Sequence, residues 1–95
     1  MTNRITKIKK AVEKAAECRA KYLESTVVVE AFRSQIMWEG VVEIFTLHGH
    51  PKAKRAYGWQ TGVGTDAQFT AVLGIPPVNS PNTAVRAAIA AKAHE

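Results

Sequence analysis

Apolar and small residues recur at helical spacing through the first third of the chain. Steps of three and four residues dominate the spacing of Ile5, Ile8, Val12, Ala15, Ala16, Tyr22, Leu23 and Val27. This spacing predicts one amphipathic helix, which Thr2 or Asn3 could cap. No Gly or Pro precedes Gly40, so we expect the helix to run to about Arg33. A strand is the alternative prediction for residues 26–33, because this segment is rich in β-branched side chains.

A long first helix would have a structural consequence. A helix of about 30 residues spans roughly 45 Å, which exceeds the width of a small three-stranded sheet. We therefore expect an overhanging helix end that offers a place for a partner.

From Ile36 onward the pattern changes to that of β-strands. Three segments are rich in β-branched and aromatic residues: "IMWEGVVEIFTL", "AKRAYGW" and "AQFTAVLGI". Glycine and proline separate them and close the last one, which is typical of turns between strands. Because the connections are short, an antiparallel meander is expected.

The C-terminal segment "NSPNTAVRAAIAAKAHE" predicts a second helix. Ser80 suits the N-cap, Pro81 suits the first helical position, and the alanine-rich sequence favours helix. The prediction for residues 1–95 is a single α+β domain in the order helix, three strands, helix (αβββα), with both helices on one face of the sheet.

The first predicted strand is apolar on both faces. Alternation points one set of large side chains one way (Trp38, Val42 and Ile44) and another set the opposite way (Val41, Phe45 and Leu47). With both helices on one face, the other face should be polar. Its apolar character predicts a covering partner, and a second protomer requires no further sequence. We therefore expect a homo-oligomer, with a dimer favoured.

Length and cysteine content indicate the cellular setting. The chain has 95 residues and one cysteine, Cys18, so it cannot form an internal disulfide. A single thiol needs no oxidising compartment. No apolar run approaches the roughly 20 residues of a membrane helix. We expect a cytoplasmic, soluble protein without membrane attachment.

The distribution of charge suggests a polyanion as an alternative partner. The net charge is +5, and Lys52, Lys54 and Arg55 form a basic cluster beside Tyr57 and Trp59. Basic groups bind phosphates and aromatic rings stack on bases. These three cations, together with the basic first helix, are the candidate nucleic-acid-binding residues.

The predicted order of elements is similar to that of double-stranded RNA-binding domains. In that family a histidine-bearing hairpin loop and a lysine-rich start of the last helix contact the RNA. The loop "HGHPKAK" matches the first feature, but "SPNTAVRAA" has no lysine cluster. One of the two motifs is therefore missing, and the sequence does not place the chain in that family.

Metal, cofactor and catalytic signals are weak. His48 and His50 are two residues apart, but a closed zinc site needs about four ligands, and Cys18 has no cysteine partner. The stretch "GVGTDA" fits a dinucleotide-binding pattern, yet a predicted strand follows it where a helix is required. No nucleophile–base arrangement is evident. We predict no metal site, no cofactor and no catalytic residue.

These observations favour a small cytosolic, non-enzymatic protein that acts by self-association and partner binding. The alternative is a nucleic-acid-binding protein that uses the basic hairpin 48–55 and the basic first helix. A further alternative is a small-molecule binder or enzyme. Its pocket, or a contact surface, would be formed by His48, His50, Tyr57 and Trp59.

Overall fold

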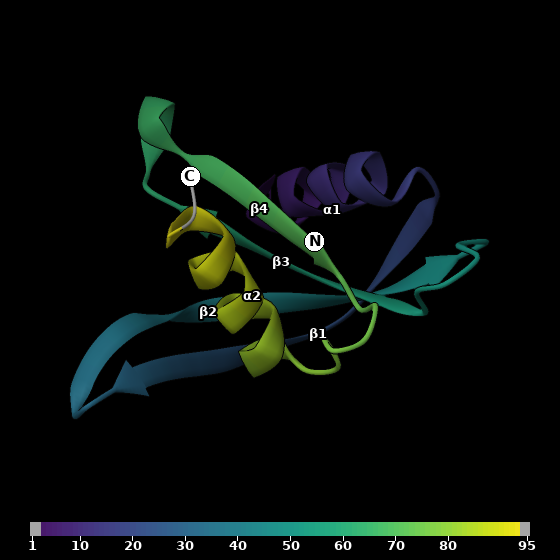
Figure 1. Ribbon diagram of the computed structural model, residues 1–95. Coiled ribbons are helices and arrows are strands. Elements are labelled where there is room, and N and C mark those ends of the chain that lie inside the picture. The colour runs from purple at the N-terminus through teal and green to yellow at the C-terminus, as the bar shows by residue number, and fades with distance from the viewer. Residues whose placement is uncertain (1–2, 94–95) are drawn as a thin grey trace.

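The computed structural model describes residues 3–93 as an α+β fold with a helix at each end (Figure 1). The elements are α1 (Asn3–Ala16), β1 (Arg19–Phe32), β2 (Gln35–His48), β3 (Arg55–Thr61), η1 (Gly64–Asp66), β4 (Gln68–Leu73) and α2 (Pro81–Ala93). The strands form one antiparallel sheet in the order β1-β2-β3-β4. The α+β class and both terminal helices are confirmed, but the sheet has four strands instead of three. The last two residues of the predicted C-terminal helix lie outside the described residues.

The predicted long first helix is wrong beyond Ala16. Glu17 adopts a left-handed φ of 55°, and the side-chain Oε2 of Glu13 accepts a hydrogen bond of 2.9 Å from the backbone N–H of Ala20. The chain then enters β1, which pairs with β2 from Arg19 to Phe32. Residues 26–29 are β-branched and favour this pleated surface, so the strand alternative holds for most of 26–33. The expected helix overhang does not exist.

A two-residue turn joins β1 to β2. Phe32 pairs with Gln35, and the residues between them, Arg33 and Ser34, have φ values of 53° and 65°. Two consecutive positive φ values are typical of a type I′ hairpin turn, which usually carries Asn-Gly. The turn thus uses residues that carry no turn signal in the sequence.

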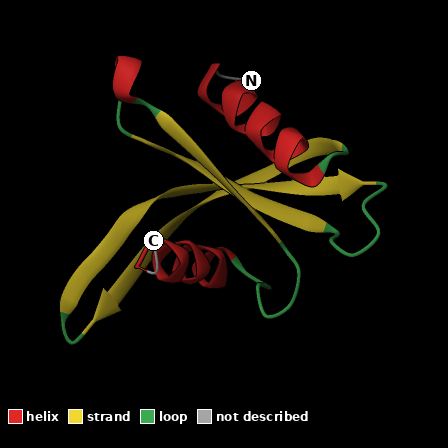
Figure 2. Ribbon diagram, turned by 45° about the horizontal axis from the view of Figure 1, so that its top comes forward, coloured by secondary structure: helices red, strands yellow, loops and turns green. Residues whose placement is uncertain are grey.

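The two helices cover opposite faces of the sheet (Figure 2), and the prediction of a single covered face is wrong. Under α1 lies a core that includes Ile8, Val12, Phe45 and Ala56. Under α2 lies a second core that includes Val28, Val42, Ile44, Tyr57, Trp59 and Val85. Both faces of β2 are apolar because each packs against its own helix.

The start of α2 follows the sequence prediction. Pro81 is its first residue, and the backbone N–H of Thr83 donates to Oγ of Ser80 at 3.2 Å. The backbone N–H of Ser80 donates in turn to Oγ1 of Thr83 at 2.9 Å. This reciprocal cap satisfies backbone groups at the helix start. Within residues 3–93, no helix is long and apolar enough to cross a membrane.

Beyond the four-stranded part of the sheet, β1 and β2 continue as a two-stranded arm. β3 pairs with β2 only from Glu43 to Thr46, so residues 35–42 of β2 pair with β1 alone. We call residues 26–42 the arm. It projects from the body of the molecule at the lower left of Figures 1 and 2.

Candidate functional site

The arm carries an exposed apolar surface on the face that α1 occupies further along the sheet. Val27 pairs with Val41, and directly opposite residues of an antiparallel pair share a face. Val29 follows two residues after Val27 and points the same way. Their exposed fractions are 69% for Val27, 45% for Val29 and 38% for Val41. α1 does not extend over these side chains, which therefore remain in contact with solvent.

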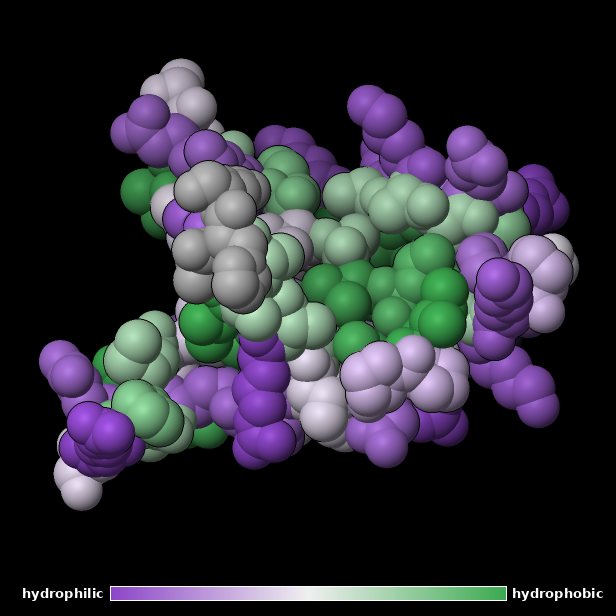
Figure 3. All heavy atoms as spheres, in the orientation of Figure 1, coloured by the Kyte–Doolittle hydropathy of each residue, from purple (hydrophilic) through white to green (hydrophobic). Residues whose placement is uncertain are grey.

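The tip of the arm adds three larger apolar side chains. Phe32, Ile36 and Met37 are all more than half exposed, and the guanidinium of Arg33 lies 5.2 Å from the centre of the Phe32 ring. In Figure 3 the arm, at the lower left, shows apolar residues beside charged ones. Phe32 and Met37 border a hollow beside α2 together with Ile89 and Ala90, so they lie on the opposite face of the arm from Val27, Val29 and Val41. We use the term apolar arm surface for the exposed apolar side chains of both faces and the tip of the arm, namely Val27, Val29, Phe32, Ile36, Met37 and Val41. It holds six of the eight exposed large apolar residues in the described part of the chain.

A buried glutamate fixes the base of the arm. Glu43 is fully buried. Its Oε1 lies 3.1 Å from Nη2 of Arg4, and its Oε2 accepts a hydrogen bond of 2.5 Å from Oγ of Ser25. The hydroxyl of Tyr22 lies 2.5 Å from the same Oγ. The network joins α1, β1 and β2, and it satisfies a carboxylate that would be costly to bury alone. We assign it a positioning role.

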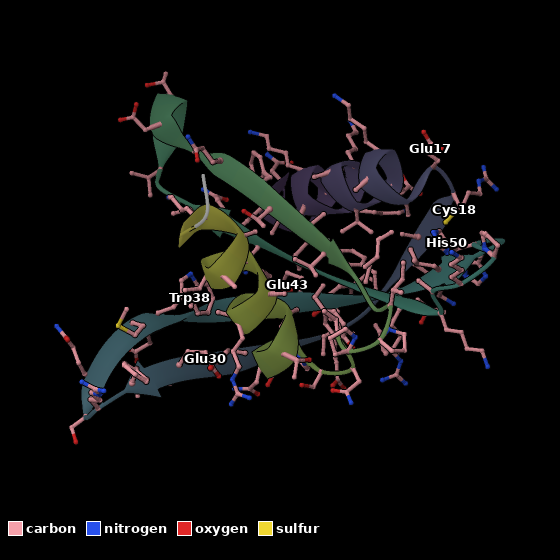
Figure 4. All side chains as sticks on the ribbon, viewed as in Figure 1. Glu17, Cys18, Glu30, Trp38, Glu43 and His50 are labelled. Carbon is pink, nitrogen blue, oxygen red and sulfur yellow. The ribbon has the colours of Figure 1, made fainter. Side chains whose placement is uncertain are left out.

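A second ion pair holds the arm against α2. Oε1 of Glu30 accepts a hydrogen bond of 2.5 Å from Nε of Arg86, and its Oε2 accepts one of 3.0 Å from Nδ2 of Asn82. These two hydrogen bonds lower the pKa of Glu30 despite the opposing effect of desolvation. Figure 4 shows Glu30 on β1 and Glu43 on β2, both on the side of the molecule from which the arm projects. Glu43 thus connects the base of the arm to α1, and Glu30 connects the middle of the arm to α2.

The four predicted contact residues do not form one surface. Tyr57 and Trp59 are each 3% exposed and belong to the core under α2. Burial raises the pKa of the Tyr57 hydroxyl. Trp59 meets Trp38 edge to face, with ring centres 5.6 Å apart. Neither ring is available for stacking on a base, so that part of the nucleic-acid hypothesis fails.

His48 and His50 lie at the end of the sheet away from the arm. His48 is exposed, whereas Nδ1 of His50 accepts hydrogen bonds from the backbone N–H groups of Lys52 (3.0 Å) and Ala53 (2.8 Å). His50 thus shapes the loop through which Ala53 enters the core. Among residues 3–93, no three His, Cys, Asp or Glu side chains lie together in a way that could hold a metal ion.

The predicted basic residues are exposed, and the sheet brings further cations to them. Lys52, Lys54 and Arg55 are all on the surface. Thr46 pairs with Arg55 on one side and Lys21 on the other, so these two cations share a face of the sheet. Arg19, two residues before Lys21, points the same way. We call Arg19, Lys21, Lys52, Lys54 and Arg55 the basic end.

Sequence reasoning counted Arg19 and Lys21 with the basic first helix, so it could not place them beside Arg55 on the sheet. It missed the apolar arm surface for the same reason. The run of β-branched residues at 26–29 was the signal that could have located both features, because a strand there requires a hairpin with the next segment.

Comparison with models of protein families, with curated proteins and with solved structures finds no match to this chain.

Proposed function

We propose that this chain is a non-enzymatic interaction protein that self-associates through the apolar arm surface, and that its partner there is a second copy of the same chain. The observation that carries the proposal is the concentration of six exposed large apolar side chains on one two-stranded arm. Two buried carboxylates, Glu43 at the base of the arm and Glu30 within it, connect the arm to α1 and α2.

The size of the surface supports a protein partner. Over both faces of the arm, the exposed fractions leave on the order of 500 Å² of apolar side chain in solvent, comparable to the largest apolar patch of a monomer, which covers about 300–600 Å². A stable interface buries about 800 Å² on each partner. An interface of that size would also have to bury polar neighbours of the arm. A two-fold pairing of identical arms is self-complementary.

The edge position of β1 supports the same partner. β1 is an edge strand of 14 residues, and long edge strands in monomers usually carry lysine, proline or inward charges that oppose pairing. The segment "TVVVEAF" at 26–32 holds one charge, Glu30, which Arg86 engages. Nothing in this segment repels an identical strand, so a second copy can cover it.

The test is the molar mass in solution by light scattering at micromolar concentration. We expect twice the mass of the chain for the native protein and the mass of one chain for Val27→Glu, because a charge at the centre of the interface is costly to desolvate. The matched control is Val63→Glu, since Val63 is 79% exposed but lies off the arm, just before η1. A native protein that is monomeric throughout, or equal dissociation by both variants, would overturn the proposal.

A second candidate function rests on the basic end. The strand register joins Arg19 and Lys21 to the cations that the sequence already indicated, which makes five exposed basic residues at one end of the molecule. Such a cluster is suited to phosphate groups on a nucleic acid. Contacts of this kind are independent of base identity, so this candidate is a sequence-independent polyanion binder.

A further inference from the structure

A groove of about 730 Å³ runs between α2 and β4. The side of α2 that borders it is formed largely by alanines, among them Ala87, Ala88 and Ala91, whose short side chains leave the space open. Trp38 and Trp59 also line the groove, and Figure 4 shows Trp38 beside α2. Of the four residues predicted to edge a pocket, Trp59 lines this groove and His48, His50 and Tyr57 do not.

The lining of the groove is apolar along its length and polar toward one end. Val72, Val85 and Ile89 contribute apolar walls, and Thr70 lies between them and the polar end. Thr61 ends β3 and pairs with Gln68, which begins β4. Lys92 lies in the last turn of α2, which ends on the side of the molecule where β3 turns into β4 (Figures 1 and 2). Thr61, Gln68 and Lys92 therefore form the polar end.

Among the described residues that line the groove, Lys92 is the one charged residue. Ligand sites commonly combine apolar walls with a few polar groups that fix the orientation of the ligand. An apolar chain would cover Trp38, Val72 and Ile89, which are partly exposed, whereas Trp59 and Val85 are already buried beneath them. A single anionic group at its end would meet the ammonium of Lys92 and the polar side chains of Thr61 and Gln68.

We propose that this groove binds an alkyl carboxylate, with the alkyl chain along α2 and β4 and the carboxylate at Lys92. The groove adjoins the α2 side of the arm, since Ile89 borders both the groove and the hollow beside Phe32 and Met37, whereas Val27, Val29 and Val41 lie on the other face of the sheet. An alcohol of the same chain length fits the apolar walls equally well but lacks the charge. The difference between acid and alcohol therefore measures the contribution of Lys92.

Tryptophan fluorescence provides a direct test. Both tryptophans of the chain line the groove, so the emission reports on this site. We expect decanoate, titrated as the dissolved monomer, to change the emission saturably, and acetate to leave it unchanged. Lys92→Gln should lower the affinity for decanoate about threefold, as expected for the loss of a solvent-exposed ion pair. It should leave the affinity for decanol unchanged. The control Lys10→Gln removes one positive charge from an exposed lysine of α1, on the other face of the sheet. It should change the affinity for neither decanoate nor decanol.

Filling the groove gives an independent check. Ala88→Phe places a ring where the alkyl chain would lie, and it should abolish binding of both decanoate and decanol while circular dichroism confirms the native fold. The proposal is overturned if decanoate gives no saturable change, if Lys92→Gln and Lys10→Gln behave alike, or if the folded Ala88→Phe variant binds decanoate normally.

Discussion

At the residue scale, the packing of α1 depends on the absence of a side chain at Gly58. A Cβ on Gly58 would stand 2.5 Å from Cγ2 of Ile8 and 3.2 Å from Cγ2 of Val12. Both neighbours are fully buried, so α1 must shift to admit a methyl group. We expect Gly58→Ala to lower the free energy of unfolding by about 1–3 kcal/mol, measured by urea denaturation.

The companion variant Ile8→Ala removes the clashing Cγ2. In the Ile8→Ala variant, Gly58→Ala should lower the free energy of unfolding clearly less than it does in the native protein, so the effects of the two changes are not additive. Additive losses, or a Gly58→Ala protein as stable as the native one, would show that α1 does not need this close approach.

Individual residues also explain which boundaries were predictable. Glycine and proline mark the breaks at Gly49, Gly62 and Pro76, and the strands on either side of them were predicted. The first helix ends at Glu17, and the β1–β2 hairpin turns at Arg33 and Ser34, all with positive φ. These residue types rarely adopt that conformation, so the sequence carried no signal for either break. Tertiary pairing imposes both.

At the element scale, the contact of α2 with β1 depends on the ionisation of Glu30. Its pKa in the folded protein is lowered from 4.5 by hydrogen bonds from Asn82 and Arg86. A lowered carboxyl pKa adds stability above the unfolded-state value, and this stability is lost as the pH falls through the folded-state pKa. We expect Glu30→Gln to lower the thermal midpoint at pH 7 and to have a smaller effect at pH 3.

Comparing Glu30→Gln with the native protein at each pH cancels the titration of the other carboxylates. A stability difference of equal size at pH 7 and pH 3 would contradict a role for the ionised carboxylate. Asn82→Ala offers a second measurement, because it removes one of the two hydrogen-bond donors and should reduce the pH dependence without changing the net charge.

The arrangement of elements was less predictable than their identity. Alternation correctly indicated that β2 is apolar on both faces, but it cannot say what covers each face. A second protomer over one face and a helix on each face both account for an apolar second face of β2. The aromatic residues Tyr57 and Trp59 illustrate this ambiguity. They share a face, as the alternation predicts, yet that face is the core under α2 and not a binding surface.

At the scale of the whole molecule, the two candidate interaction surfaces lie at opposite ends of the β1–β2 hairpin. The apolar arm surface occupies residues 27–41, whereas Arg19 and Lys21 lie at the other end, beside β3. The strand register places the two surfaces at opposite ends of this hairpin, so self-association through the arm would leave the basic end free. The functions can therefore be tested separately, with Val27→Glu as the variant that affects the arm alone.

The basic end predicts a steep salt dependence of polyanion binding. Each phosphate that a cation neutralises releases counterions, so the logarithm of the affinity for duplex DNA falls linearly with the logarithm of salt concentration. We expect Arg19→Ala/Lys21→Ala to lower the affinity and reduce this slope by about one unit per lost contact. The triple variant of Lys52, Lys54 and Arg55 to alanine should act in the same direction.

The matched control for this prediction is Lys7→Ala/Lys10→Ala on α1. It removes the same charge as Arg19→Ala/Lys21→Ala, but α1 covers the opposite face from Lys21 and Arg55, and both lysines are exposed. If binding depends on net charge alone, the two double variants should give equal slopes, and the basic end would then have no special role. A clearly smaller slope for Arg19→Ala/Lys21→Ala would locate the phosphate contacts on the face that the strand register creates.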